Sequence, residues 1–235
     1  MKQKIGILGY GEIGQSLGMF YEDPMIKTLS QNTLKNGLDV LHVCIPYSEY
    51  FVDNVFQVLK KYSAELIIIH STVKVGTTQK IAEKYPQTVH SPVRGVHPNL
   101  YNGMKTFVKF IGCDNLKVGK RVAEHFEDIG IKGEIVANSK TTELGKLLST
   151  TYYGVCIAYH NYADKLCIQH NLDFEKVMTR FNETYNEGYT KLGKKNVVRP
   201  VLTPSNGAIG GHCIVNNKNI LKEQFGDDPL LQNIV

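Results

Sequence analysis

Apolar residues in the first half of the chain fall into short continuous runs that alternate with helix-like stretches. The runs cover residues 4–8, 39–45 and 65–70, with shorter ones at 88–90, 106–111 and 134–136. Helical periodicity covers residues 50–61, 77–84 and 117–129. Apolar strands that are continuous rather than alternating, with helices between them, predict a parallel sheet covered on both faces.

The pattern changes after Asn138. Residues 139–171 contain no strand-like run, and their apolar positions recur at helical spacing. A second helix is predicted over 174–192 and a short third one over 216–225, with a loop rich in Pro, Gly and Asn between them. We therefore predict an α/β fold. A Rossmann-like, doubly wound, mostly parallel sheet would occupy residues 1–138, and a small all-helical domain for substrate binding and dimerisation would occupy 139–235.

A glycine-rich segment follows the first predicted strand and opens a helix. It reads Gly9-Tyr10-Gly11-Glu12-Ile13-Gly14. The first glycine permits a tight turn, the second lets a pyrophosphate approach the backbone, and the third lets helix and strand pack closely. The helix terminus adds N–H groups and the positive end of its dipole. The segment predicts a dinucleotide site.

The adenosine end of this site is less well specified. An acidic residue for the ribose is expected about 20 residues after the glycines, at the end of the second strand. Residues 25–29 could form that strand, but Ser30 and Gln31 follow it, and the helix that usually comes next looks trimmed. Lys27 and Lys35 are either partners for a ribose phosphate or surface lysines. NAD is the expected cofactor, and NADP stays open.

Composition narrows the class of protein. The chain has 235 residues, 42% of them hydrophobic, and a net charge of +5 that is mild and spread out. No apolar run reaches the roughly 20 residues that a membrane span needs, and the start of the chain lacks a signal-peptide pattern. We expect a cytoplasmic protein with a small-molecule substrate and no membrane or nucleic-acid partner. The five cysteines contain no CxxC pair, and no cluster has metal-ligand spacing, so no metal is expected.

Several segments, in a fixed order along the chain, match a family pattern. They are Cys44-Ile45-Pro46, 71–78 (STVKVGTT), Ser91-Pro92-Val93, 143–147 (ELGKL) and 207–214 (GAIGGHCI). Together they resemble the STVxxGTT, SPE, ELxKL and GxGGxC segments of the UDP-glucose/GDP-mannose (nucleotide-sugar) dehydrogenase family. The last segment is closest to the GGHCIP form of the acetylmannosamine-type enzymes. That family lies within the wider 6-phosphogluconate dehydrogenase-like superfamily.

The resemblance implies an NAD-dependent dehydrogenase that oxidises an alcohol or aldehyde of a small, anionic or sugar-like substrate. It implies that Cys213 captures an aldehyde covalently and that Lys146 stabilises the oxyanion or acts as acid and base. Thr72 would position water. Pro46 and Ser71 would contact the cofactor together with the glycine segment.

Further binding residues are expected on two loops. Residues 94–98 (RGVHP) resemble the GxHP segment of prephenate dehydrogenases, which implies that Arg94 and His97 pair with an anionic substrate; a loop histidine without a role is the alternative. His212 either lowers the pKa of the neighbouring Cys213 thiol or faces solvent. Relatives with a helical dimer core imply a homodimer through residues 139–171.

Three positions depart from the family pattern. Asn217 replaces an acid, Val93 replaces a glutamate and Thr150 replaces an asparagine. An amide cannot act as a general base. The sequence also lacks the family's C-terminal UDP-binding domain, so it resembles a truncated, divergent member. Besides covalent catalysis, two alternatives stay open. One is a single reversible hydride step in which the cysteine is incidental. The other is a non-catalytic, degenerate protein that binds a dinucleotide or a partner.

Overall fold

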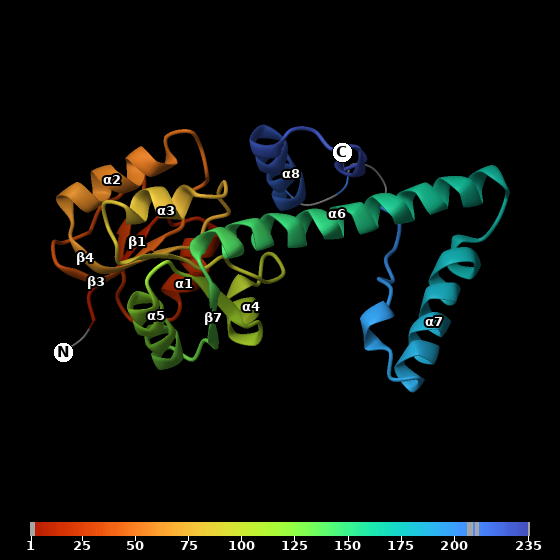
Figure 1. The fold of residues 1–235 in the computed structure, drawn as a ribbon, viewed down its shortest axis with the longest axis horizontal. Coiled ribbons are helices and arrows are strands. Elements are labelled where there is room, and N and C mark those ends of the chain that lie inside the picture. The colour runs from red at the N-terminus through yellow and green to blue at the C-terminus, as the bar shows by residue number, and fades with distance from the viewer. Residues whose placement is uncertain (1–2, 206–208, 210–211, 235) are drawn as a thin grey trace. The chain divides into compact units, whose positions relative to one another are not determined.

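The chain forms two compact units, Met1–Lys146 and Leu147–Val235. The computed structural model describes residues 3–205, 209 and 212–234 (Figure 1). The boundary between the units falls inside a long helix, α6 (Ser139–Gln169), which begins in the first unit and continues in the second.

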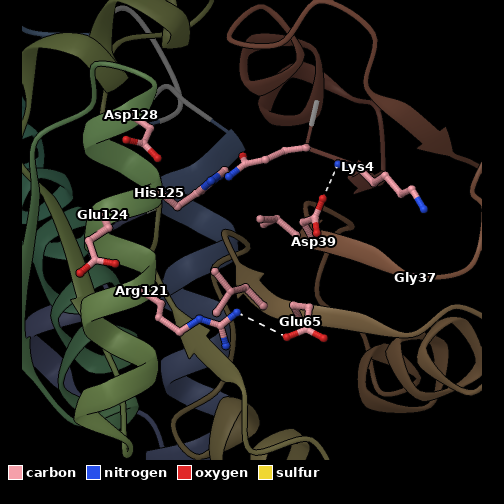
Figure 2. A pocket seen from close by; sticks show the side chains of 11 residues that line it. Lys4, Gly37, Asp39, Glu65, Arg121, Glu124, His125 and Asp128 are labelled. Carbon is pink, nitrogen blue, oxygen red and sulfur yellow. Dashed lines mark hydrogen bonds and ion pairs between the residues drawn. The ribbon is translucent and has the colours of Figure 1, made fainter. Parts of the chain in front are cut away.

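The first unit is built on one seven-stranded sheet. Its strands are β1 (Ile5–Leu8), β2 (Met25–Lys27), β3 (Leu38–Val43), β4 (Ala64–Ile69), β5 (Thr88–His90), β6 (Lys109–Gly112) and β7 (Gly133–Ala137). They lie in the order β2-β1-β3-β4-β5-β6-β7, and every neighbouring pair is parallel except β5 with β6. At the amino ends of β1 and β3, the Lys4 N–H donates to Asp39 Oδ2 over 2.6 Å (Figure 2). The predicted mostly parallel α/β fold is confirmed.

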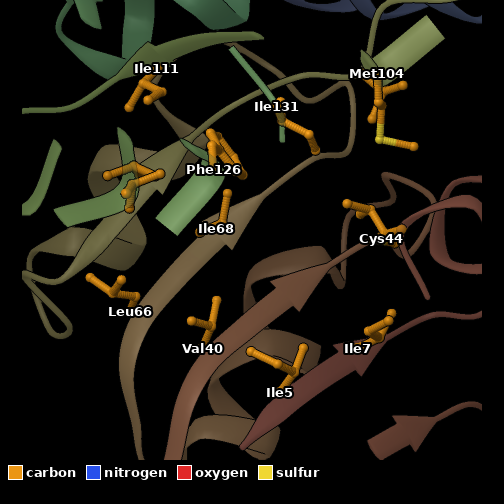
Figure 3. Packing of buried hydrophobic residues seen from close by; sticks show 14 of the residues in the cluster. Ile5, Ile7, Val40, Cys44, Leu66, Ile68, Met104, Ile111, Phe126 and Ile131 are labelled. Atoms are coloured by element: carbon orange, nitrogen blue, oxygen red, sulfur yellow. The ribbon is translucent and has the colours of Figure 1, made fainter. Parts of the chain in front are cut away.

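Helices cover both faces of this sheet. They are α1 (Glu12–Gly18), α2 (Phe51–Lys61), α3 (Thr77–Ala82), α4 (Leu100–Thr106) and α5 (Leu116–Asp128). Consecutive strand residues alternate between two apolar clusters, as the pleat requires. Ile68 packs in the cluster that contains Phe126 of α5 (Figure 3), and Ile67 packs in the cluster that contains Phe51 of α2. Burial on both faces explains the continuous apolar runs in the sequence.

Two boundaries in this unit differ from the sequence-based prediction. The run predicted as a strand over 106–111 begins at Lys109, because Thr106 ends α4, which was not predicted. α4 is short and is held by the burial of Leu100 and Met104 in the first cluster, at 2% exposure each. The predicted strand over 25–29 ends at Lys27, where the chain turns.

The link from β2 to β3 contains no helix, whereas the short spacing predicted a trimmed one. It folds back on β2 through a bridge between Lys27 and Asn32 and through the Thr28 N–H, which donates to the Gln31 carbonyl. Leu34, 7% exposed, packs in the cluster on the α2 face. A buried leucine thus covers the sheet where a helix usually lies.

The described elements of the second unit are all helical. A π-helical turn (Glu175–Thr179) leads into α7 (Arg180–Lys191), and α8 (His212–Phe225) follows a loop; short 3-10 turns span Lys195–Val197 and Pro229–Leu231. α8 packs on α6 at Gly154, where an added Cβ would lie 2.6 Å from Ile214 Cγ2. Ile209, Ile214 and Ile234 form the small core. In the described part of the chain, no helix has the length and hydropathy of a membrane span.

Candidate functional site

The glycine segment turns the chain from β1 into α1 at the carboxyl edge of the sheet. Gly9 has φ +90°, and an added Cβ would lie 2.8 Å from Ile45 N of the neighbouring segment. A Cβ on Gly14 would collide with the Gly9 carbonyl oxygen. Around Gly11, in contrast, an added Cβ would meet no atom within 4 Å. Packing therefore requires the outer two glycines, and the open space at the N-terminus of α1 fits the approach of a phosphate group.

The other residues of this segment have distinct surroundings. Tyr10 and Ile13 pack against the apolar cluster on the α5 face. Glu12, in the first turn of α1, accepts a hydrogen bond at Oε2 from His97 Nδ1 over 2.7 Å. The fold thus brings together two residues that the sequence assigned separately, one to the cofactor and one to the substrate.

A hydrogen bond joins the segment after β3 to the segment after β4. The Ser71 hydroxyl is buried and donates to the Ile45 carbonyl over 2.6 Å, next to the exposed Pro46. Thr72 is half-buried in the loop that follows. α3 begins at Thr77, so Thr72 is not the cap of that helix.

A buried carboxylate ties α6 to this loop. Glu143 is 0% exposed, and its two oxygens accept hydrogen bonds from Gly76 N over 2.6 Å and Thr78 N over 2.7 Å. Burial raises the pKa of Glu143, and the hydrogen bond from Thr78 is the largest effect that opposes the rise. Lys146 lies one helical turn after Glu143 and is half-buried. Its charge acts on His90 and Lys109 near the end of β5.

Lys109 is a site residue that the sequence analysis missed. It is 3% exposed, and its Nζ donates to the carbonyls of Ser91 over 2.7 Å and of Pro92 over 3.2 Å. The pKa of Lys109 is lowered to about 7, mainly by burial and also by the charge of Lys146. Val93, where the related family has a glutamate, is a core residue at 5% exposure.

A chain of buried histidines runs beside Lys109. Tyr21 Oη lies 2.8 Å from His125 Nε2 and 2.8 Å from His42 Nε2. His42 Nδ1 lies 2.9 Å from His70 Nε2, and His70 Nδ1 lies 2.9 Å from the Ser91 carbonyl. The three histidines are at most 3% exposed. The hydrogen-bonded chain therefore connects α5, through β3 and β4, to Ser91, whose carbonyl also accepts from Lys109.

The Ser91 carbonyl at the end of this hydrogen-bonded chain of side chains fixes the direction of every hydrogen bond in it. A carbonyl only accepts, so His70 Nδ1 carries a hydrogen and Nε2 of the neutral ring accepts from His42. The same reasoning makes Tyr21 donate to His42 and accept from His125 Nε2. Burial is the largest cause that lowers the pKa of each ring, to about 4 for His125, so the rings are neutral at pH 7.

His90 lies apart from that chain and joins β5 to its neighbours. Its Nδ1 lies 2.8 Å from Thr142 Oγ1 of α6, and its Nε2 lies 3.1 Å from the Ser71 carbonyl. Burial lowers the pKa of His90 to about 3. The sequence held one signal for this arrangement, a histidine in or directly after each of three successive apolar runs.

Arg94 lies against aromatic rings near β6. Its guanidinium carbon is 4.8 Å from the ring centroid of Phe110 and 5.6 Å from that of Phe107, and Nη1 donates to the Val108 carbonyl over 3.4 Å. Among the described residues, no group of three or more histidine, cysteine, aspartate and glutamate side chains could hold a metal ion.

The remaining candidates belong to the second unit. Cys213 lies exposed in the first turn of α8, and Asn217 lies one turn later at 3% exposure. The Nδ2 of Asn217 is buried and has no hydrogen-bond partner among the residues that the structure describes. The His212 side chain and residues 206–208 and 210–211 of the predicted nucleophile loop lie outside the described residues.

Comparisons with known proteins agree with the motifs. No protein-family profile matches the chain. Over 206 residues the chain is 26% identical to a UDP-N-acetyl-D-mannosamine dehydrogenase of Methanococcus vannielii. The matched region covers 80% of this chain and 45% of that protein. An Escherichia coli protein of the same name is 26% identical over 187 residues, 72% of this chain and 41% of that protein. The chain is similar to the nucleotide-sugar dehydrogenases. The resemblance inferred from the motifs is confirmed.

Solved structures show the same fold. A UDP-D-ManNAc dehydrogenase of Pyrococcus horikoshii superposes with a TM-score of 0.77 at 19% identity, over 98% of this chain and 66% of that one. A UDP-glucose dehydrogenase of Pyrobaculum islandicum superposes with a TM-score of 0.71 at 13% identity, over 95% of this chain and 64% of that one. The chain spans about 45% of the length of the first curated relative.

Proposed function

We propose that this protein is a NAD(P)-dependent dehydrogenase that oxidises an alcohol or aldehyde of a small, anionic, sugar-like substrate. The observation that carries the proposal is the glycine turn, whose outer glycines are required by packing and whose middle glycine borders open space. The two curated relatives are named for oxidation of a UDP-sugar, which supports the substrate class. When bound, the nicotinamide accepts a hydride.

Lys146 is proposed to act on the reacting oxygen. Glu143 fixes the start of α6 on the loop after β4, which holds the Lys146 backbone beside the carboxyl edge of the sheet. There its ammonium stabilises an alkoxide, and its neutral amine accepts the hydroxyl proton. Thr72, on the same loop, is proposed to orient a water molecule.

Cys213 is proposed as the nucleophile that captures an aldehyde. Its exposure at the start of α8 is compatible with that role. Hydrolysis of a thioester would need a base, and Asn217 and Val93 stand where the related family has carboxylates. The burial of Val93 in the core favours a second candidate, a single reversible hydride step with Lys146 as acid and base.

We also propose that the protein forms a homodimer through α6. Several large apolar side chains on this helix are exposed: Tyr152, Tyr153, Tyr159, Tyr162 and Ile168. An exposed apolar surface of this kind is typical of an interface. Light scattering after gel filtration should give twice the mass of one chain for the parent protein. The double variant Tyr159→Glu, Ile168→Glu should give the mass of a single chain. A monomer at all concentrations would refute the dimer.

The first experiment is a thermal-shift titration with NAD⁺, NADH, NADP⁺ and NADPH. A ligand that binds only the folded state adds about 2.7 kcal/mol at roughly 100 times its dissociation constant. Gly11→Val should abolish the shift without loss of stability, because it fills the open space, whereas Gly188→Ala on α7 should leave the shift intact.

Turnover then separates the alternatives. If Cys213→Ser abolishes oxidation of UDP-sugars, the result supports covalent capture by the cysteine. If the same variant still transfers a hydride, the result supports the single-step reaction. Absence of a shift with all four cofactors would favour the non-catalytic, partner-binding alternative.

A further inference from the structure

The two lysines that the sequence offered for a ribose phosphate lie at opposite edges of the sheet. Lys27 ends β2, and its carbonyl accepts a hydrogen bond from the Gly9 N–H of the glycine turn over 2.9 Å. Lys35 directly precedes Asn36, whose Oδ1 accepts from the Ser63 N–H, the last one before β4 begins. Lys35 is therefore at the amino edge, and Lys27 is the lysine next to the proposed cofactor site.

A tight turn closed by hydrogen bonds follows Lys27. The Thr28 N–H donates to the Gln31 carbonyl over 2.8 Å. The Thr28 hydroxyl oxygen accepts from the Ser30 N–H over 3.2 Å and from the Gln31 N–H over 3.0 Å. The hydroxyl oxygens of Thr28 and Ser30 lie 3.4 Å apart, and Ser30 is exposed. The turn thus holds hydroxyl groups directly beyond the end of β2.

The surroundings of this turn carry no negative charge of their own. Residues 24–38, which contain β2 and the whole link to β3, include two lysines and no aspartate or glutamate. Among the ion pairs of the described residues, none involves Lys27, whose charge acts on the neighbouring Tyr62 hydroxyl. A half-buried lysine without a carboxylate beside it attracts an anion.

This composition separates the two nicotinamide cofactors. In dinucleotide-binding folds, a carboxylate at the end of the second strand accepts a hydrogen bond from the ribose 2′-hydroxyl of NAD, and a cation accommodates the 2′-phosphate of NADP. Here Thr28 stands directly after β2, where the carboxylate is expected, and Lys27 stands beside it. A 2′-hydroxyl would lack its usual acceptor, whereas a 2′-phosphate would meet a cation and a hydroxyl donor.

We propose that the end of β2 binds the 2′-phosphate of NADP, so that the protein prefers NADP to NAD. This inference rests on the proposed dehydrogenase function and replaces NAD, the cofactor expected from the sequence. The Lys27 ammonium balances the charge of the phosphate, and the Ser30 hydroxyl donates to one of its oxygens.

Calorimetric titration of the full chain with NADP⁺ and NAD⁺ tests the preference without any turnover. NADP⁺ should bind at least about tenfold more tightly, because its extra phosphate forms charge-assisted hydrogen bonds. The fragment 2′,5′-ADP should exceed 5′-AMP in affinity by a similar factor. Equal affinities, or tighter binding of NAD⁺, would overturn this inference and leave the proposed dehydrogenase standing. If neither cofactor binds, both proposals fail.

One variant supplies the missing carboxylate. In Thr28→Asp, the new side chain can accept the same two backbone N–H groups, so the turn is kept. Its charge should weaken NADP⁺ binding by about tenfold or more and leave NAD⁺ binding unchanged or tighter. Unchanged affinity for NADP⁺ would show that the phosphate lies elsewhere and would overturn the inference.

A matched pair of lysine variants locates the phosphate. Lys27→Met should weaken binding of NADP⁺ by about tenfold and leave NAD⁺ unaffected. Lys35→Met makes the same change of charge in the same link at the amino edge, and it should alter neither affinity. If Lys35→Met weakens NADP⁺ binding as much as Lys27→Met, general attraction of an anion to a basic protein explains the preference, and the site at β2 is refuted. Thermal unfolding without cofactor checks that each variant is folded.

Discussion

Tyr21→Phe removes one hydroxyl from the middle of the buried histidine chain. The Tyr21 oxygen accepts from His125 and donates to His42, each over 2.8 Å. Without it, a donor on one ring and an acceptor on the other lose their partners, and His42 is 0% exposed. Each unsatisfied buried group costs about 1–3 kcal/mol, so the free energy of unfolding should fall by about 2–6 kcal/mol. That is a large share of the stability of an ordinary domain.

Urea unfolding at pH 7.5, followed by circular dichroism, measures this loss as a lower midpoint at unchanged slope. Tyr50→Phe is the matched control, because Tyr50 is 61% exposed in the first unit and its change should stay within about 0.5 kcal/mol. If both variants unfold at the same urea concentration as the parent, the hydroxyl does not join the two rings and the argument fails. The ¹⁵N resonances of His42 and His125 provide a second check, since both should move in Tyr21→Phe.

Three further predictions concern the buried ionisable groups. The buried histidines stay neutral in the folded state, as the lowered pKa values of about 3 for His90 and about 4 for His125 show. The unfolded chain binds their protons near pH 6.5, so stability should fall below that pH by up to about 1.4 kcal/mol per pH unit for each; a flat urea profile between pH 7 and 5 would contradict this. Lys109, with a folded pKa of about 7, should make stability rise from pH 7 toward 10, and Lys109→Met should abolish that rise without a loss at pH 7. Glu143→Gln should cost about 1–3 kcal/mol and lower turnover, since Lys146 loses its anchor; unchanged turnover would refute the positioning role.

The sequence by itself determined the elements whose signals are local. The continuous apolar runs predicted the strands because each strand is buried on both faces. The glycine segment was predictable because its turn needs a positive φ at Gly9 and a missing side chain at Gly14, requirements that single residues meet. The short spacing before β3 predicted a trimmed connecting helix, and the structure has no helix there.

Only the tertiary structure decided which polar groups meet. The buried chain joins Tyr21 to His125, far apart in sequence, and apolar periodicity cannot show that a histidine within a strand has a partner on the next one. Lys109 was hidden for the same reason, because its acceptors are carbonyls of another segment. Hydrophobic burial is set by the residue type and its spacing, so it appears in the sequence. A buried hydrogen bond needs two groups at one distance, and that distance exists only once the strands are packed.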